Sequence, residues 1–145
     1  KPPPRAERLL DEYCATVDAL KQQGRLLIGG KSLGGRVASM VADDLHGAGK
    51  VAGLVCLGYP FHPPGTPEKL RTAHLAALRC PALICQGTRD PFGTREEAAG
   101  YDLSAAITLR WFEGDHDLEP RKADGVTLDD NLGQAASAVA DWTGA

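Results

Sequence analysis

Hydrophobic positions follow two different spacings along this chain, and segments of the two kinds alternate. Apolar residues at helical spacing predict helices over residues 6–23, 36–47, 70–78, 95–99 and 128–142. Short continuous apolar runs predict strands over residues 26–28, 51–57, 82–85 and 107–112. Strands that alternate with helices are typical of an α/β domain in which helices cover a mainly parallel sheet.

Turn-forming residues separate these elements. Gly24 is the expected end of the first helix, and residues 58–67 (GYPFHPPGTP) are expected to form a surface loop. In the last helix we expect one apolar stripe to face the sheet, formed by Leu132, Ala135, Val139 and Trp142.

Composition and charge restrict the class of protein. The 145 residues suffice for a single domain over residues 6–145, with the proline-rich residues 1–5 as an extended linker. Hydrophobic residues at 43% and charged residues at 24% indicate a soluble globular protein. No apolar run reaches the roughly 18–20 residues of a membrane span, so we expect no membrane partner. The net charge of −3 offers no broad cationic surface, so we expect no nucleic-acid partner.

The cysteines and histidines predict neither disulfides nor a metal site. The four cysteines are scattered without a C-x-x-C pair, which favours reduced, mostly buried thiols and a cytoplasmic location. No group of histidines and cysteines has the spacing of metal ligands, and no cofactor is expected. His46 is expected at the end of a helix and His74 on a helix surface.

Three of the four predicted strands lead into a residue type that carries out catalysis. Ser32 follows the first strand, Asp90 the third and His116 the fourth. Functional groups gather at the carboxyl ends of parallel strands, so we expect these three residues near one another. Ser32 lies in residues 30–34 (GKSLG), a G-x-S-x-G pattern between a strand and a helix. A phosphate-binding P-loop needs a different glycine spacing and is disfavoured.

The G-x-S-x-G pattern suits a serine nucleophile for physical reasons. A serine on a tight strand-to-helix turn exposes its hydroxyl above the sheet, and Gly30 and Gly34 leave room on either side of it. The helix that follows directs its first amides, beginning with that of Leu33, at an oxyanion. His116 would accept the serine proton, and Asp90 would orient the imidazole.

Each of these candidates also has an ordinary structural explanation. Asp90 precedes a proline, and Asp-Pro favours turns, while His116 fits a surface histidine. A substrate pocket near the serine is a weaker hypothesis, because packing explains its aromatic members equally well. Its candidate residues are Tyr59, Phe61, His62 and Phe92.

Three segments together resemble one known superfamily. GGKSLGGR (29–36), QGTRDPFGT (86–94) and EGDHDLEP (113–120) are similar to segments of the alpha/beta-hydrolase superfamily. The resemblance is greatest to its small dienelactone-hydrolase-like branch, with the testis-expressed 30 proteins and the NSL-complex subunit 3 hydrolase-like domain. It implies a three-layer α/β/α fold, and Ser32 as nucleophile, Asp90 as acid and His116 as base.

The function that the resemblance implies is that of a serine hydrolase without a cofactor. Such an enzyme acts on an ester, thioester or related acyl carbonyl of a small molecule, through an acyl-enzyme intermediate. The alternative is a catalytically weak or inactive hydrolase-like scaffold for protein interaction, since a fold alone does not establish an activity.

The resemblance is incomplete before the nucleophile. Members of the superfamily usually carry further strands there, including the loop that supplies a second oxyanion amide, and nothing before Ser32 resembles them. We therefore expect either a fragment of a longer protein or a degenerate member. A sheet without those strands has an exposed edge, through which we expect possible self-association.

Overall fold

A four-stranded parallel sheet forms the centre of the structure. The computed structural model describes residues 2, 5–20 and 25–144. The strands follow chain order across the sheet, as β1 (Leu27–Lys31), β2 (Gly53–Leu57), β3 (Ala82–Gly87) and β4 (Ile107–Phe112). All of β3 is buried, because both faces of a central parallel strand are covered. The four predicted strands are confirmed.

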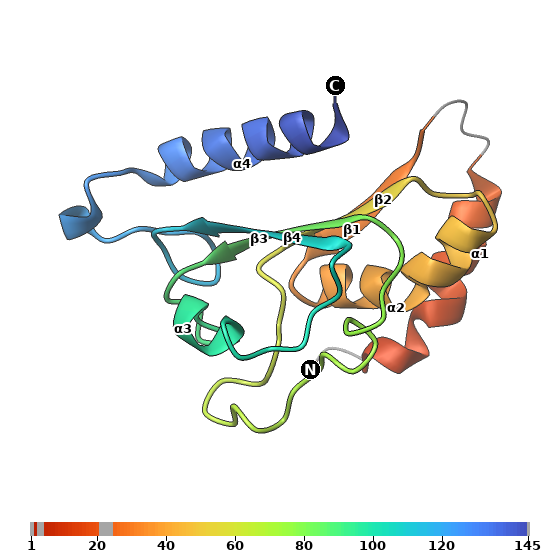
Figure 1. Cartoon of the computed structure of the whole chain (residues 1–145), viewed down its shortest axis with the longest axis horizontal. Helices are drawn as coiled ribbons and strands as arrows, with labels where there is room; N and C mark the ends of the chain where they lie inside the picture. The colour runs from red at the N-terminus through yellow and green to blue at the C-terminus, as the bar shows by residue number, and fades with distance from the viewer. Residues whose placement is uncertain (1, 3–4, 21–24, 145) are drawn as a thin grey trace.

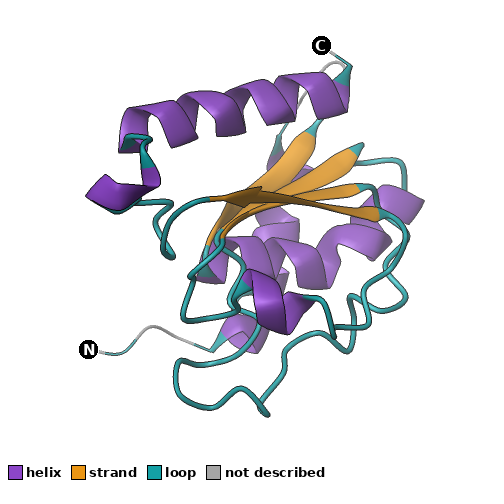
Figure 2. Ribbon diagram, turned by 60° about the vertical axis from the view of Figure 1, so that its left-hand side comes forward, coloured by secondary structure: helices purple, strands orange, loops and turns teal. Residues whose placement is uncertain are grey.

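Helices cover both faces of this sheet, which confirms the predicted three-layer α/β/α arrangement (Figures 1 and 2). One face carries α4 (Leu128–Thr143). The opposite face carries α1 (Leu10–Ala19), α2 (Leu33–Gly47) and the short α3 (Arg95–Ala98). Two 3-10 turns, η1 (Ala6–Arg8) and η2 (Lys122–Asp124), precede α1 and α4.

Each face of the sheet has its own apolar core. Val41 and Leu45 of α2 belong to one buried cluster with Leu54 of β2. On the other face, Ala135 of α4 belongs to a buried cluster with Leu83 of β3. Full burial of a side chain as large as leucine stabilises a fold by about 1.5–3 kcal/mol. Packing on both faces therefore holds the strands, and with them the loops that follow their carboxyl ends.

The first helix is shorter than the predicted 6–23. A 3-10 turn comes first, and α1 ends at Ala19, where Leu20 takes an extended conformation. The expected stop at Gly24 and the predicted residues 21–23 lie outside the described residues, as does most of the 1–5 linker.

The helix predicted over residues 70–78 is wrong. The segment forms turns instead, and its apolar residues Leu75 and Leu78 are buried. The backbone carbonyls of these two leucines accept hydrogen bonds from the amide and the hydroxyl of Ser104, far away in sequence. The two leucines are therefore buried because the long connection between β2 and β3 packs against the core. Their spacing along the sequence does not reflect a helix.

The last predicted helix is confirmed as α4, and three of the four residues of its predicted stripe face the sheet: Ala135 is buried, and Val139 and Trp142 pack against the same core. Leu132 is the exception, and Asn131 is buried in its place. Leu132 is 47% exposed, whereas Asn131 is 3% exposed. The Asn131 side-chain amide donates to the backbone carbonyls of Glu113 and Leu118, each at 2.9 Å. Each such bond contributes about 0.5–1.5 kcal/mol, so the two bonds favour burial of the polar residue at this position of the helix.

β1 is an edge strand of the described sheet, and Tyr13 of α1 contacts its backbone. The tyrosine hydroxyl accepts from the Gly29 amide at 3.3 Å and donates to the Gly29 carbonyl at 3.4 Å. Burial raises the pKa of Tyr13, so the hydroxyl keeps its proton at neutral pH. This contact satisfies one residue of the edge; self-association through the edge stays a prediction.

The cysteines are free, as predicted. Cys56, Cys80 and Cys85 are buried and Cys14 is half-buried. Burial raises the pKa of Cys56 to about 12, which keeps its thiol protonated and unreactive. Among the helices of the described residues, none has the length and apolar character to cross a membrane.

Close packing between β1 and α2 explains two of the glycines around Ser32. A Cβ atom on Gly30 would lie 2.7 Å from the backbone of Gly34, and one on Gly35 would lie 2.6 Å from the Gly30 carbonyl oxygen. A Cβ atom on Gly34 would meet no heavy atom within 4 Å. The steric role expected for Gly34 therefore belongs to Gly35.

This difference gives a matched pair of substitutions in one helix. Gly34→Ala should raise the free energy of unfolding by up to about 1 kcal/mol, because alanine is the better helix former. Gly35→Ala should lower it by about 1–3 kcal/mol, because the added methyl group overlaps the backbone of β1. Urea unfolding of both variants measures the two changes, and changes of the same sign would contradict the assignment.

Candidate active site

Ser32 occupies the tight turn between β1 and α2 that the sequence predicts. Its backbone has φ +52° and ψ −120°, a region that residues other than glycine rarely adopt. The Ser32 amide donates to the Leu57 carbonyl at 2.9 Å, and the Ser32 carbonyl accepts from the Arg36 amide at 3.0 Å. Bonds to the neighbouring strand and to the helix thus hold a conformation that costs of the order of 1–3 kcal/mol.

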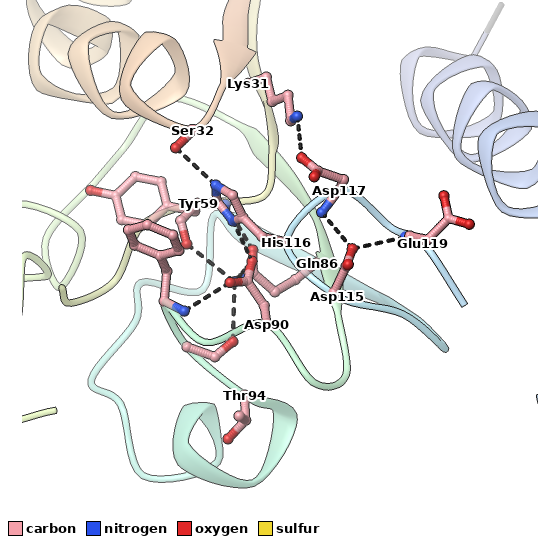
Figure 3. Close-up of polar contacts among 12 residues, drawn as sticks. Lys31, Ser32, Tyr59, Gln86, Asp90, Thr94, Asp115, His116, Asp117 and Glu119 are labelled. Atoms are coloured by element: carbon pink, nitrogen blue, oxygen red, sulfur yellow. Dashed lines mark hydrogen bonds and ion pairs between the residues drawn. The ribbon is translucent and has the colours of Figure 1, made fainter. Parts of the chain in front are cut away.

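The structure brings Ser32, His116 and Asp90 into one hydrogen-bonded line (Figure 3). His116 Nδ1 lies 2.8 Å from Asp90 Oδ2, and His116 Nε2 lies 2.9 Å from Ser32 Oγ. A carboxylate can only accept, so Nδ1 carries the proton and the unprotonated Nε2 accepts from the serine hydroxyl. This is the tautomer in which an imidazole can take a proton from serine.

Asp90 is fully buried, and its carboxylate accepts three hydrogen bonds. The donors are the Phe92 amide at 2.8 Å, Gln86 Nε2 at 3.0 Å and His116 Nδ1 at 2.8 Å. A carboxylate is stable in the protein interior only when its oxygens are hydrogen-bonded in this way. The group that orients His116 is thereby fixed in position.

Gln86, at the end of β3, is a part of the site that sequence reasoning missed. Its Oε1 accepts from the Tyr59 amide at 2.8 Å. Its Nε2 lies 3.1 Å from the Tyr59 carbonyl, 3.0 Å from Asp90 Oδ2 and 3.1 Å from the Gly93 carbonyl. Gln86 therefore ties the loop after β2 to the loop after β3. A glutamine at the end of an otherwise apolar strand was the available signal.

The loop after β4 is built to present His116. Asp115 Oδ1 accepts from the amides of Asp117 (2.8 Å) and Glu119 (3.0 Å), which closes the loop around the histidine. Asp117 pairs instead with Lys31, the residue before the serine. The two acidic neighbours of His116 thus serve the loop and its contact with β1, while Asp90 approaches the ring.

The Leu33 amide has the placement expected of an oxyanion donor. α2 begins at Leu33, immediately after the serine. The first amides of a helix have no carbonyl partner within that helix and carry its positive dipole end. A carbonyl oxygen attacked by Ser32 would therefore develop its charge at this helix end.

Only one of the four candidate pocket residues lies at the site. The Phe92 ring stacks on His116 with 4.3 Å between ring centroids, and it lines a cleft beside Ser32. Tyr59 and Phe61 are fully buried with their ring centroids 4.8 Å apart, so packing accounts for both. His62 is 3% exposed and bonds Glu97 at 3.0 Å, away from the cleft.

The cleft beside Ser32 has a volume of about 640 Å³ and is open to solvent. Both apolar and charged residues line it around the serine. The apolar residues include Leu33, Pro60 and Phe92, and the charged residues are Arg5, Glu7, Arg36 and Arg71. Sequence reasoning missed these charged residues, and the place of Arg36 four residues after Ser32 was the available signal for one of them.

His46 and His74 lie outside this line of residues. His46 is in the last turn of α2, as predicted. The surface position predicted for His74 is wrong, since its Nε2 bonds Ser39 Oγ at 2.8 Å in a half-buried turn. Burial, and then the nearby Arg36 charge, lower the pKa of His74. Within the described ranges no cluster of three or more His, Cys, Asp or Glu residues could hold a metal ion.

The burial of His74 predicts a loss of stability at acid pH. Because its folded pKa is lowered, protons bind the unfolded chain more readily than the folded one as pH falls below about 6.5. The free energy of unfolding should therefore fall between pH 7.5 and 5.5, and by less in His74→Gln. Urea unfolding at both pH values measures this, and an equal fall in the two proteins would contradict it.

The Gln86 contacts predict a large loss of stability on replacement by an apolar side chain. Gln86→Leu should lower the free energy of unfolding by about 1–3 kcal/mol, because the buried Tyr59 amide loses its acceptor. Gln134, an exposed glutamine of α4, provides the matched control. Gln134→Leu should change stability by less than about 0.5 kcal/mol. Equal effects of the two substitutions in urea unfolding would refute the role given to Gln86.

A solved structure with the same architecture is similar to this chain. The chain is similar to the esterase domain of a Rhodothermus marinus protein, with 21% identity and a TM-score of 0.60 over 94% of this chain and 67% of that one. It is also similar to a CIB-like hydrolase from Thermoplasma acidophilum, with 18% identity and a TM-score of 0.49 over 90% of this chain and 58% of that one. At 21% identity the likeness to the esterase domain concerns the fold alone, and the chain spans only part of each structure.

A family comparison covers nearly the whole sequence. The model of a family described as "Alpha/beta hydrolase domain" matches residues 1–144. The parallel sheet in this strand order, with a serine turn after β1, agrees with that match. The chain belongs to the alpha/beta hydrolase family.

Proposed function

We propose that this domain is a serine hydrolase that cleaves an ester, thioester or related acyl carbonyl. The observation that carries the proposal is the unbroken line from Ser32 through His116 to the buried Asp90, beside an open cleft. Family membership supports hydrolase activity. The same motifs support a place in the dienelactone-hydrolase-like branch, and free thiols fit the reducing cytoplasm.

The first half of the reaction transfers the acyl group to the enzyme. Ser32 Oγ attacks the carbonyl carbon while its proton passes to His116 Nε2. The carbonyl oxygen becomes an oxyanion beside the Leu33 amide at the start of α2. The carbonyl then re-forms as the bond to the leaving group breaks, and His116 gives its proton to that group.

The second half releases the acyl group to water. His116 Nε2, neutral again, takes a proton from water as the water oxygen attacks the acyl-serine. The second oxyanion collapses, the proton returns from His116 to Ser32, and a carboxylic acid departs. Asp90 stabilises the imidazolium in both halves, because it is a buried negative charge 2.8 Å from Nδ1.

A covalent probe tests this proposal directly. The protein is treated with a fluorophosphonate and its intact mass is measured over time. We expect one adduct on the parent chain and none on Ser32→Ala. His116→Ala should label slower by about 10²-fold or more, since a positioned base contributes on the order of 10²–10⁴-fold.

Exposed or peripheral residues of the same types provide the controls. Ser137→Ala, on the exposed side of α4, and His46→Ala, at the end of α2, should label at the parent rate. No adduct on a folded parent chain would overturn the proposal and favour the alternative, a hydrolase-like scaffold for protein interaction.

A further inference from the structure

Positively charged residues outnumber acidic ones among the residues that line the cleft beside Ser32. Arg5, Arg36 and Arg71 line it, and Glu7 is the acidic residue among its lining groups. The chain as a whole has a net charge of −3. The cleft, where a substrate would lie, therefore has a local excess of positive charge, although the chain as a whole is negatively charged.

Arg36 projects from the same helix end as the serine. It lies in the first turn of α2, four residues after Ser32, and its amide donates to the Ser32 carbonyl at 3.0 Å. Its side chain is 16% exposed. Nη2 bonds Glu7 Oε1 at 3.2 Å, whereas Nε is buried and has no hydrogen-bond partner among the described residues. Part of this guanidinium is therefore unsatisfied.

Arg71 is held at the cleft by its backbone. Its amide donates to the Phe61 carbonyl at 2.7 Å, and its carbonyl accepts from the Tyr59 hydroxyl at 3.0 Å. Both partners are fully buried, so the segment that carries Arg71 is anchored to the core. Burial, and then the charge of Arg36, lower the pKa of Arg71, although arginine stays protonated at neutral pH.

The pairing with Glu7 does not satisfy this charge. The Glu7 side chain is 57% exposed, and a solvent-exposed ion pair contributes only about 0–1 kcal/mol. One carboxylate faces Arg36 while Arg71 lines the same cleft. The contact does show that a carboxylate can bind the Arg36 guanidinium, because Glu7 and Arg36 line the same cleft.

We propose that Arg36 and Arg71 bind a carboxylate on the substrate, so that the site prefers half-esters or half-thioesters of short dicarboxylic acids. The short spacing follows from Arg36 being one helical turn from the attacking serine. Guanidinium groups suit this role because their planar N–H groups match a carboxylate in paired hydrogen bonds. The inference rests on the proposed function in that Ser32 is the attacking group.

Binding without turnover tests the inference independently of activity. The Ser32→Ala protein is titrated with monomethyl glutarate and with methyl pentanoate, a neutral ester of the same length, and amide and arginine Nε–H signals are followed by NMR. We expect the glutarate to bind about tenfold more tightly, as for hydrogen bonds to charged groups. Equal affinity for the two esters would overturn the inference.

Variants of the two arginines assign the preference to the cleft. Added to Ser32→Ala, Arg71→Met should remove most of the tenfold preference, and Arg36→Lys should reduce it, because lysine keeps the charge but loses the planar fork. Arg79→Met, at an exposed arginine outside the cleft, should keep the preference. Loss of preference in the Arg79 variant, or tighter binding of methyl 4-phosphonobutanoate than of the glutarate, would overturn the carboxylate assignment.

Activity separates this inference from the proposed function. With the parent chain, kcat/KM for 4-nitrophenyl hydrogen glutarate should exceed that for 4-nitrophenyl pentanoate by about tenfold, mainly through KM. A chain that labels with fluorophosphonate but shows no such ratio keeps the proposed function and refutes the inference. A chain that binds the glutarate selectively but never labels keeps the arginine site and refutes the hydrolase.

Discussion

A carboxylate buried in the protein interior is the constraint around which this end of the sheet is organised. Asp90 is fully buried, and an ionised carboxylate there costs several kcal/mol unless it is hydrogen-bonded. Its three donors come from Gln86 at the end of β3, Phe92 in the following loop and His116 after β4. Satisfying one charge therefore fixes three segments relative to one another, and His116 reaches Ser32 with its Nδ1 already occupied.

The parts of this arrangement that follow from local rules could be predicted from the sequence. Buried parallel strands appear as apolar runs, and the carboxyl ends of such strands meet at one edge of the sheet. The strand pattern alone therefore predicts that Ser32, Asp90 and His116 lie near one another, as they do. The serine turn was equally predictable, because a strand, a G-x-S-x-G pattern and a helix follow one another directly.

What the sequence could not supply were partners that depend on tertiary contacts. The spacing of residues 70–78 is helical, yet the carbonyls of that segment bond to Ser104. Leu132 is the more apolar residue, yet Asn131 is buried because it bonds two carbonyls of the loop around His116. Tyr59 and Phe92 have the same aromatic character, and only the fold places one in the core and the other at the cleft.

The net charge of the chain likewise does not predict the local charge of the cleft. A net charge of −3 disfavours binding of a polyanion that must contact a wide surface, but it says nothing of the local charge in a cleft that three arginines line. The position of Arg36 was readable in the sequence, since it stands one helical turn after Ser32. Arg71 was not, because a connection bonded to Phe61 and Tyr59 brings it to the cleft from the loop after β2. The proposed nucleophile is thus set by local sequence, whereas the proposed carboxylate preference depends on how a long loop packs.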